Sequence, residues 1–130
     1  MRFRDAVATE LERRRCGQPR YSLRRFARTL GVHHSTMSRL LRTRRPVPAR
    51  TLLAVARGLR MSPAEITEFR AQEDAVAVID AIRRNGFRPD CRWLASITGL
   101  RIDQINIVLQ RLLRIGALRM QSASHWEVSE

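Results

Sequence analysis

The stretch from Ser22 to Arg45, SLRRFARTLGVHHSTMSRLLRTRR, predicts two short helices joined by a tight turn. Ser22 is of the small polar type that caps helix N-termini, and the helix that follows it is expected to end at Gly31. Its apolar residues recur at helical spacing and are Leu23, Phe26, Ala27 and Leu30. A second helix is expected over residues 34–43, with an apolar side made of Met37, Leu40 and Leu41. Because glycine adopts a positive φ without strain, Gly31 allows the chain to reverse sharply between the two helices.

Helical periodicity continues on both sides of this stretch. A preceding helix carries Phe3, Val7 and Leu11 and is expected to end near Gly17 in the left-handed conformation. A following helix is expected to bury Leu52, Val55, Ala56 and Leu59. The segment Ser62-Pro63-Ala64-Glu65 has the reciprocal capping pattern and starts another helix, with Ile66 and Phe69 turned inward and an end near Arg70. Residues 1–71 are therefore predicted to form a five-helix unit.

The remaining residues, 72–130, predict a second small module. Three helices are expected: one from Glu73 to Asn85 with Val76, Ile79 and Ile82 inward, a short one lined by Leu94 and Ile97, and one lined by Ile105, Val108, Leu109 and Leu112. The apolar period then changes to two over Leu118–Gln121 and His125–Val128, which indicates a β-hairpin. The whole chain is thus expected to be mainly α, and its second part follows the element order of a winged helix.

Positive charge is confined to the first part of the chain. The net charge is +13, and all 25 basic residues are arginine. Residues 1–60 hold sixteen arginines and three acids and so carry the whole excess, whereas residues 61–130 are neutral overall. A concentration of one sign of charge indicates a nucleic acid or an anionic membrane surface as partner. The planar donor fork of arginine also suits bidentate contacts to phosphate or to a guanine edge.

Several classes of protein are excluded by what the sequence lacks. No apolar run is longer than that from Ala75 to Ile79, which is far shorter than the roughly 20 residues of a membrane-spanning helix. The alternately charged start does not resemble a secretory signal. Cys16 and Cys91 lie far apart, so neither a disulfide nor a zinc-ligand spacing is expected. No phosphate-binding loop, nucleophile motif or pair of catalytic carboxylates appears. We expect a cytoplasmic, nucleoid-associated protein with no catalytic residues, no metal and no cofactor.

Residues 22–45 resemble the helix-turn-helix of the phage-repressor and Cro superfamily. The resemblance rests on Phe26-Ala27, on the turn glycine Gly31, on the apolar Val32 and Met37, and on the run Ser35-Thr36-Met37-Ser38-Arg39-Leu40. The chain departs from the pattern at His33, where the family has a small polar N-cap, and at Thr43, where it often has glycine. With Phe3-Arg4-Asp5 and Met61–Glu65 included, the chain also resembles a largely uncharacterised bacterial regulator family with an N-terminal helix-turn-helix and a C-terminal winged-helix segment.

The resemblance implies a transcriptional regulator, expected to be a repressor, that binds double-stranded DNA with the helix 34–43 in the major groove. The residues that it places against base edges are His34, Ser35 and Arg39. The residues expected at the DNA backbone are Ser22, Arg24, Arg25, Ser38, Arg42, Arg44, Arg45 and Arg50. Residues 72–130 are expected to form a homodimer or to bind a protein partner, and DNA binding at a second site is the alternative. Ile107, which lies off the apolar side of its helix, is the candidate interface residue, and Asp103 beside it would repel phosphate.

Four other hypotheses stay open at this stage. The arginines could merely solvate the surface of a helical bundle. RNA could be the ligand, although this half of the chain offers few aromatic residues for stacking. An antitoxin-like module would use residues 72–130 to cover a protein partner and the other half to autoregulate. An architectural protein would bind DNA without regard to sequence.

Overall fold

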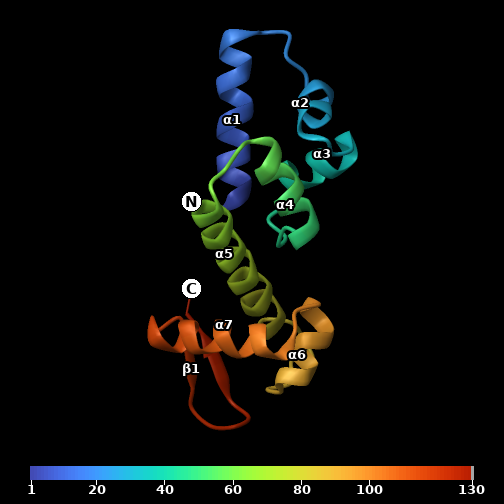
Figure 1. Ribbon diagram of the computed structural model, residues 1–130. Coiled ribbons are helices and arrows are strands. Elements are labelled where there is room, and N and C mark those ends of the chain that lie inside the picture. Colours follow the sequence, from blue (N-terminus) through green and yellow to red (C-terminus); the bar gives the residue numbers. More distant parts are fainter. Residues whose placement is uncertain (130) are drawn as a thin grey trace. The chain divides into compact units, whose positions relative to one another are not determined.

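The computed structural model describes residues 1–129 and is helical except for one C-terminal hairpin (Figure 1). The predicted fold class, mainly helical with a small antiparallel hairpin at the end, is confirmed. The chain divides into two compact units, Met1–Glu73 and a second that begins at Asp74. The division falls within one helix, α5 (Pro63–Ile82).

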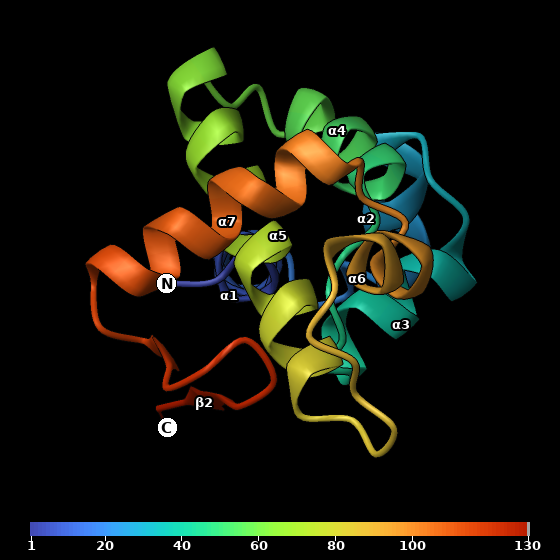
Figure 2. The same cartoon turned by 90° about the horizontal axis from the view of Figure 1, so that it is seen from below.

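The first unit consists of α1 (Phe3–Gly17), α2 (Leu23–Leu30), α3 (His34–Arg42), α4 (Ala49–Gly58) and the beginning of α5. α2 packs against α3 and α4, and α1 packs against α3. Figure 2 views α1 nearly end-on, with α2, α3 and α4 to one side of it. The helices therefore enclose a single core between α1 and the α2–α4 layer.

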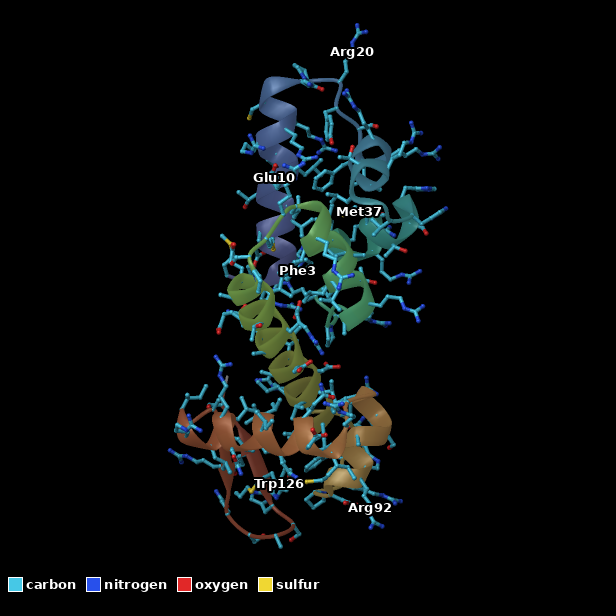
Figure 3. The ribbon with its side chains drawn as sticks, viewed as in Figure 1. Phe3, Glu10, Arg20, Met37, Arg92 and Trp126 are labelled. Atoms are coloured by element: carbon cyan, nitrogen blue, oxygen red, sulfur yellow. The ribbon has the colours of Figure 1, made fainter. Side chains whose placement is uncertain are left out.

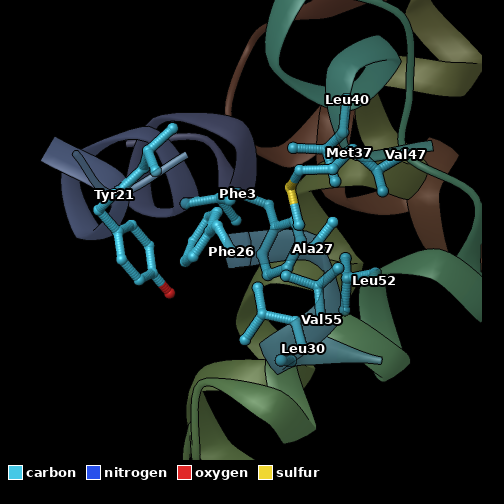
Figure 4. Packing of buried hydrophobic residues seen from close by; sticks show 13 residues of the cluster. Phe3, Tyr21, Phe26, Ala27, Leu30, Met37, Leu40, Val47, Leu52 and Val55 are labelled. Atoms are coloured by element: carbon cyan, nitrogen blue, oxygen red, sulfur yellow. The ribbon is translucent and has the colours of Figure 1, made fainter. Parts of the chain in front are cut away.

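Most of that core is built from the apolar residues that helical spacing predicts, and Tyr21 and Val47 add to it from outside the helices (Figure 4). Its buried members are Phe3, Val7, Leu11, Tyr21, Phe26, Ala27, Leu30, Met37, Leu40, Val47, Leu52, Val55 and Ala56, and Leu59, Ile66 and Phe69 are partly buried against them. The Phe3 and Phe69 rings meet edge to face with centroids 5.4 Å apart, a geometry that aromatic pairs favour. This contact ties the start of α1 to α5.

α2 has the predicted caps at both of its ends. Ser22 Oγ accepts a hydrogen bond from the Arg25 amide at 3.0 Å, which satisfies one of the free donors of the first turn of α2. Gly31 takes a φ of 74°, and the Val32 amide after it donates to the Ala27 carbonyl at 3.0 Å. α3 ends at Arg42, one residue before the predicted boundary, with Thr43 as its C-cap.

Gly58, the last residue of α4, marks the place where α4 comes closest to α2. A β-carbon added there would lie 2.8 Å from Leu30 Cδ2 and 3.0 Å from Leu30 Cα. Both distances are shorter than ordinary van der Waals contact between carbon atoms. The packing of α2 on α4 therefore requires a residue without a side chain at this position.

α1 ends at Gly17, as predicted, but the conformation of that end differs from the prediction, and one predicted break between helices is absent. Gly17 does not adopt the left-handed conformation. Gln18, the next residue, is extended (φ −142°) because it precedes Pro19, so the chain leaves α1 without reversing its direction. The helices predicted over about 63–70 and 73–85 are one continuous helix, α5. Residues 70–74 between them contain neither glycine nor proline, so nothing there interrupts helical hydrogen bonding.

The second unit consists of the end of α5, α6 (Cys91–Thr98), α7 (Ile102–Arg114), β1 (Leu118–Met120) and β2 (Trp126–Val128). α6 packs against α7, and α7 contacts β1. The two strands pair antiparallel, with Leu118 opposite Val128. The four residues predicted to line α7 are buried, together with Val78, Ala81, Ile82, Leu94 and Leu118.

Two inward faces in this unit differ from the prediction. α5 packs through Ala75, Val78, Ile79 and Ile82, so Val76 lies outside the core. α6 packs through Cys91, Leu94 and Ala95, and Ile97 is 38% exposed. Ile79, Ile82 and Leu94 pack inward as predicted, so the difference is confined to Val76 and Ile97. In both helices the apolar residues extend over two neighbouring faces, and tertiary packing decides which of them are buried.

Candidate nucleic-acid interface

α3 has a buried side and an exposed side, and its two buried residues define the buried side. Met37 is fully buried and Leu40 is 6% exposed, both within the core of the first unit. Ser35 and Arg39 consequently lie exposed on the other side, with His34 half-buried at its edge. The three residues predicted to contact bases thus belong to the polar side of one helix, and each can donate a hydrogen bond.

His33 caps α3 although it is not one of the usual capping residues. Its Nδ1 accepts a hydrogen bond from the Ser35 amide at 3.1 Å and lies 2.7 Å from the Ser35 hydroxyl. Because the first amides of a helix have no partner within the helix, the imidazole performs the function that serine or aspartate usually performs. Nδ1 accepts only in the tautomer that carries its proton on Nε2, so the cap requires a neutral ring.

The surroundings of His34 lower its pKa and so favour its neutral imidazole form. Partial burial lowers its pKa below the ordinary value of 6.5, and the positive charge of Arg24 acts in the same direction. A neutral ring presents one nitrogen as donor and the other as acceptor. His34 can therefore form hydrogen bonds of either kind with a base edge.

The N-terminus of α2 holds three of the predicted backbone contacts. Ser22, Arg24 and Arg25 are all exposed. Arg25 is the most constrained of them, because its guanidinium lies 5.0 Å from the centroid of the Tyr21 ring and its Nη1 donates to Gln18 Oε1 at 2.9 Å. The stacking fixes the direction of the side chain before any ligand arrives. The Arg25 amide, by contrast, already bonds Ser22 and is not available to a phosphate.

The remaining predicted backbone contacts follow the exposed side of α3 and the residues after it. Arg42, Arg44, Arg45 and Arg50 are exposed, and Ser38 is half-buried. Figure 3 shows nitrogen-tipped side chains projecting from the α2–α4 side of the unit. Within residues 1–129, no carboxylate lies within ion-pair distance of Arg39 or of these four arginines. Their charge is therefore uncompensated, whereas the arginines of α1 pair with Glu10 and Glu12.

Two arginines near the start of the chain support this surface, and sequence reasoning did not single them out. Arg2 donates to the carbonyls of Arg44 at 2.8 Å and Arg45 at 3.3 Å, and Arg4 donates to the carbonyl of Leu41. These partners lie about 40 residues away along the chain. Local periodicity carries no signal for such contacts.

A small cavity adjoins this surface. A mainly apolar cavity of about 200 Å³ lies beneath α3, between Leu40, Val47 and Thr51. Ligand pockets are typically larger, about 300–1,000 Å³. Over residues 1–129, no three His, Cys, Asp or Glu side chains gather where they could hold a metal ion. No helix in that range is long and apolar enough to cross a membrane.

Comparison with known proteins gives one match. No curated protein and no solved structure matches the chain. Residues 6–69 match the model of a family described as a helix-turn-helix domain, and that range extends from α1 into α5 and contains α2, the turn at Gly31 and α3. The first unit of this chain is therefore a helix-turn-helix domain, which indicates a DNA-binding, regulatory protein.

Proposed function

We propose that this chain is a sequence-specific transcriptional regulator that binds double-stranded DNA with α3 in the major groove. The exposed side of α3 supports this most directly, because Ser35 and Arg39 lie opposite the buried Met37 and face no acidic partner within residues 1–129. A helix fits the major groove, about 12 Å wide, and the second helix of a helix-turn-helix contacts bases through its N-terminal residues. His34, Ser35 and Arg39 meet base edges, and the fork of Arg39 is suited to guanine O6 and N7.

The DNA backbone is held on both sides of α3. At one end, Ser22, Arg24 and Arg25 approach phosphates around the N-terminus of α2. At the other end, the contacts come from Ser38, Arg42, Arg44, Arg45 and Arg50. Phosphate contacts carry little sequence information, but they fix the position of the protein on the duplex so that Arg39 meets one base pair.

We propose repression as the mode of regulation and the nucleoid of the cytoplasm as the place of action. A small protein that occupies an operator blocks transcription without any further activity. The proposal gives the chain no catalytic role.

The second unit is proposed to be a winged-helix-like module that joins two copies of the chain. Ile107 supports this, because it lies on α7 with 66% of its side chain exposed, and an exposed large apolar residue favours a protein contact. Asp103 on the same helix disfavours contact with phosphate. A dimer would present two α3 helices to half-sites one helical turn apart, about 34 Å.

Selection of binding sites from a random duplex DNA pool, at about 0.15 M salt, tests the proposal. An enriched inverted repeat is the expected result, and the Arg39→Ala variant should lose preference at one base position per half-site. Tight binding without any enrichment would favour an architectural protein. Binding only after a small protein co-purifies would favour an antitoxin-like module, and no binding at all would contradict the proposal.

A further inference from the structure

The guanidinium of Arg2 joins two parts of the first unit that are far apart in sequence. Its Nη2 lies 3.0 Å from Glu73 Oε2 and 3.3 Å from Oε1, so it pairs with both oxygens of a carboxylate in α5. Its Nη1 donates to the Arg44 carbonyl at 2.8 Å, and Nη2 also reaches the Arg45 carbonyl at 3.3 Å. One side chain thus connects α5 with the backbone just after α3.

The burial of Glu73 distinguishes this connection from an exposed surface ion pair. Glu73 is 3% exposed, and it is the one charged residue within residues 1–129 that is buried. A buried carboxylate costs free energy unless a cation and hydrogen bonds compensate it, and Arg2 supplies both. The pair therefore fixes the orientation of the guanidinium, whose Nη1 and Nη2 atoms also donate to the Arg44 and Arg45 carbonyls.

A second, neighbouring arginine acts on the same segment. Arg4 donates to the carbonyl of Leu41 in the last turn of α3, where a positive charge also interacts favourably with the helix dipole. Asp5 accepts hydrogen bonds from the Arg2 amide at 3.1 Å and from Arg4 Nη1 at 3.3 Å. The end of α3 and residues 44–45 are thus both held by the first residues of α1.

We propose that Arg2, held in place by Glu73, is a positioning residue for DNA binding. It fixes the backbone at residues 44–45 so that the exposed side chains of Arg44 and Arg45 meet phosphates while α3 lies in the groove. Arg2 itself does not contact DNA, because its charge is compensated by Glu73 and its Nη donors are engaged. This inference rests on the proposed function of α3, and it adds residues that the exposed surface does not reveal.

The salt dependence of DNA binding distinguishes positioning from a general effect on charge or stability. Each phosphate contact contributes about 0.9 to the slope of log K against log salt concentration for duplex DNA. If part of a variant is unfolded, its apparent Kd rises by a constant factor, which leaves the slope unchanged. The probe is a labelled, random-sequence 30-base-pair duplex, a length chosen to be about three helical turns.

Glu73→Gln gives the most discriminating result, because charge alone and positioning predict opposite outcomes. The substitution makes the protein more positive, so a pure charge effect would tighten binding. Positioning predicts weaker binding and a slope reduced by up to about 2, the value for two lost contacts. Glu12→Gln, which removes the same charge from the exposed side of α1, is the matched control and should keep the slope of the unsubstituted protein.

Arg2→Gln is expected to reduce the slope in the same way, and Arg13→Gln, an exposed arginine on α1, serves as its control. The double variant Arg44→Ala/Arg45→Ala gives the slope of a protein that has lost both contacts. Adding Arg2→Gln to that double variant should change the slope no further. Glu73→Gln decides the question by itself if Arg2→Gln does not fold.

The two possible failures are distinguishable. If the unsubstituted protein does not bind the duplex, the proposed function is wrong and the inference is wrong with it. If the unsubstituted protein binds and both Glu73→Gln and Arg2→Gln retain its slope, the positioning role alone is overturned.

Discussion

Gly58 lies against Leu30 so closely that a β-carbon at residue 58 would come within 2.8 Å of Leu30 Cδ2. Alanine is ordinarily favoured over glycine in a helix by about 1 kcal/mol, but overpacking a core costs about 1–3 kcal/mol. Gly58→Ala should therefore lower the free energy of unfolding by about 1 kcal/mol, as measured by urea denaturation. Gly17→Ala is the control, because no atom lies within 4 Å of its added carbon, and it should be neutral or slightly stabilising.

The cap that His33 provides for α3 predicts a second stability effect. His33→Ala removes the acceptor of the Ser35 amide and should cost about 1 kcal/mol of unfolding free energy. His33→Asn, which keeps a side-chain acceptor, should restore most of that loss. Equal stability of the alanine and asparagine variants would show that the imidazole does not act as a cap.

Arg39 and Arg44 should affect DNA binding in different ways if α3 contacts bases. Arg39→Ala is expected to cost about 1–3 kcal/mol on the selected site and to relax specificity at one position. Arg44→Ala should weaken binding to all sequences alike. Fluorescence anisotropy with the selected site and with single-base variants of it measures both effects, and a uniform loss in both variants would contradict base contact by Arg39.

Glu10 gives the first unit a specific sensitivity to acid. Its hydrogen bonds with Arg13, and then the one with Arg14, outweigh burial and lower its pKa from 4.5 to about 2. A carboxyl group whose pKa is lower in the folded state stabilises the fold above its unfolded pKa and loses that contribution as pH falls. Glu10→Gln should therefore lose less stability than the unsubstituted protein between pH 5 and pH 2. We expect a difference of about 1 kcal/mol, because Arg13 is well exposed.

The proposed dimer predicts a change of mass with one substitution on α7. Ile107→Glu should leave the fold intact, because the side chain is exposed, and should convert a dimer to a monomer in analytical ultracentrifugation. Gln110→Glu adds the same charge at another exposed position of α7 and serves as the control. A monomeric mass for the unsubstituted protein at micromolar concentration would count against the dimer itself.

Features that depend on a few neighbouring residues could be predicted from the sequence. The cap at Ser22, the positive φ of Gly31 and the reciprocal cap of Ser62 with Glu65 are all present. Each rests on hydrogen bonds within three or four residues. The same holds for the exposed side of α3, because the buried positions of Met37 and Leu40 determine it.

Features that depend on tertiary contacts could not be predicted. Val76 and Ile97 belong to helices whose apolar residues allow two faces, and only packing selects between them. The pairing of Arg2 with Glu73 joins residues 71 positions apart, and no periodic pattern in the sequence indicates it. Gly17 and Gly31 show a further limit, since only Gly31 reverses the chain and Pro19 determines how α1 ends.

Glu73 also sets the length at which the DNA-binding half can be made as a fragment. A fragment ending at residue 71, where the predicted unit stops, would contain every side chain proposed to contact DNA, yet it would lack the carboxylate that Arg2 binds. The guanidinium would then lie partly buried beside two carbonyls with no counter-ion. A fragment that ends at residue 73 includes the counter-ion of Arg2. The shortest useful fragment is therefore defined by the need to neutralise one charge rather than by the last apolar contact.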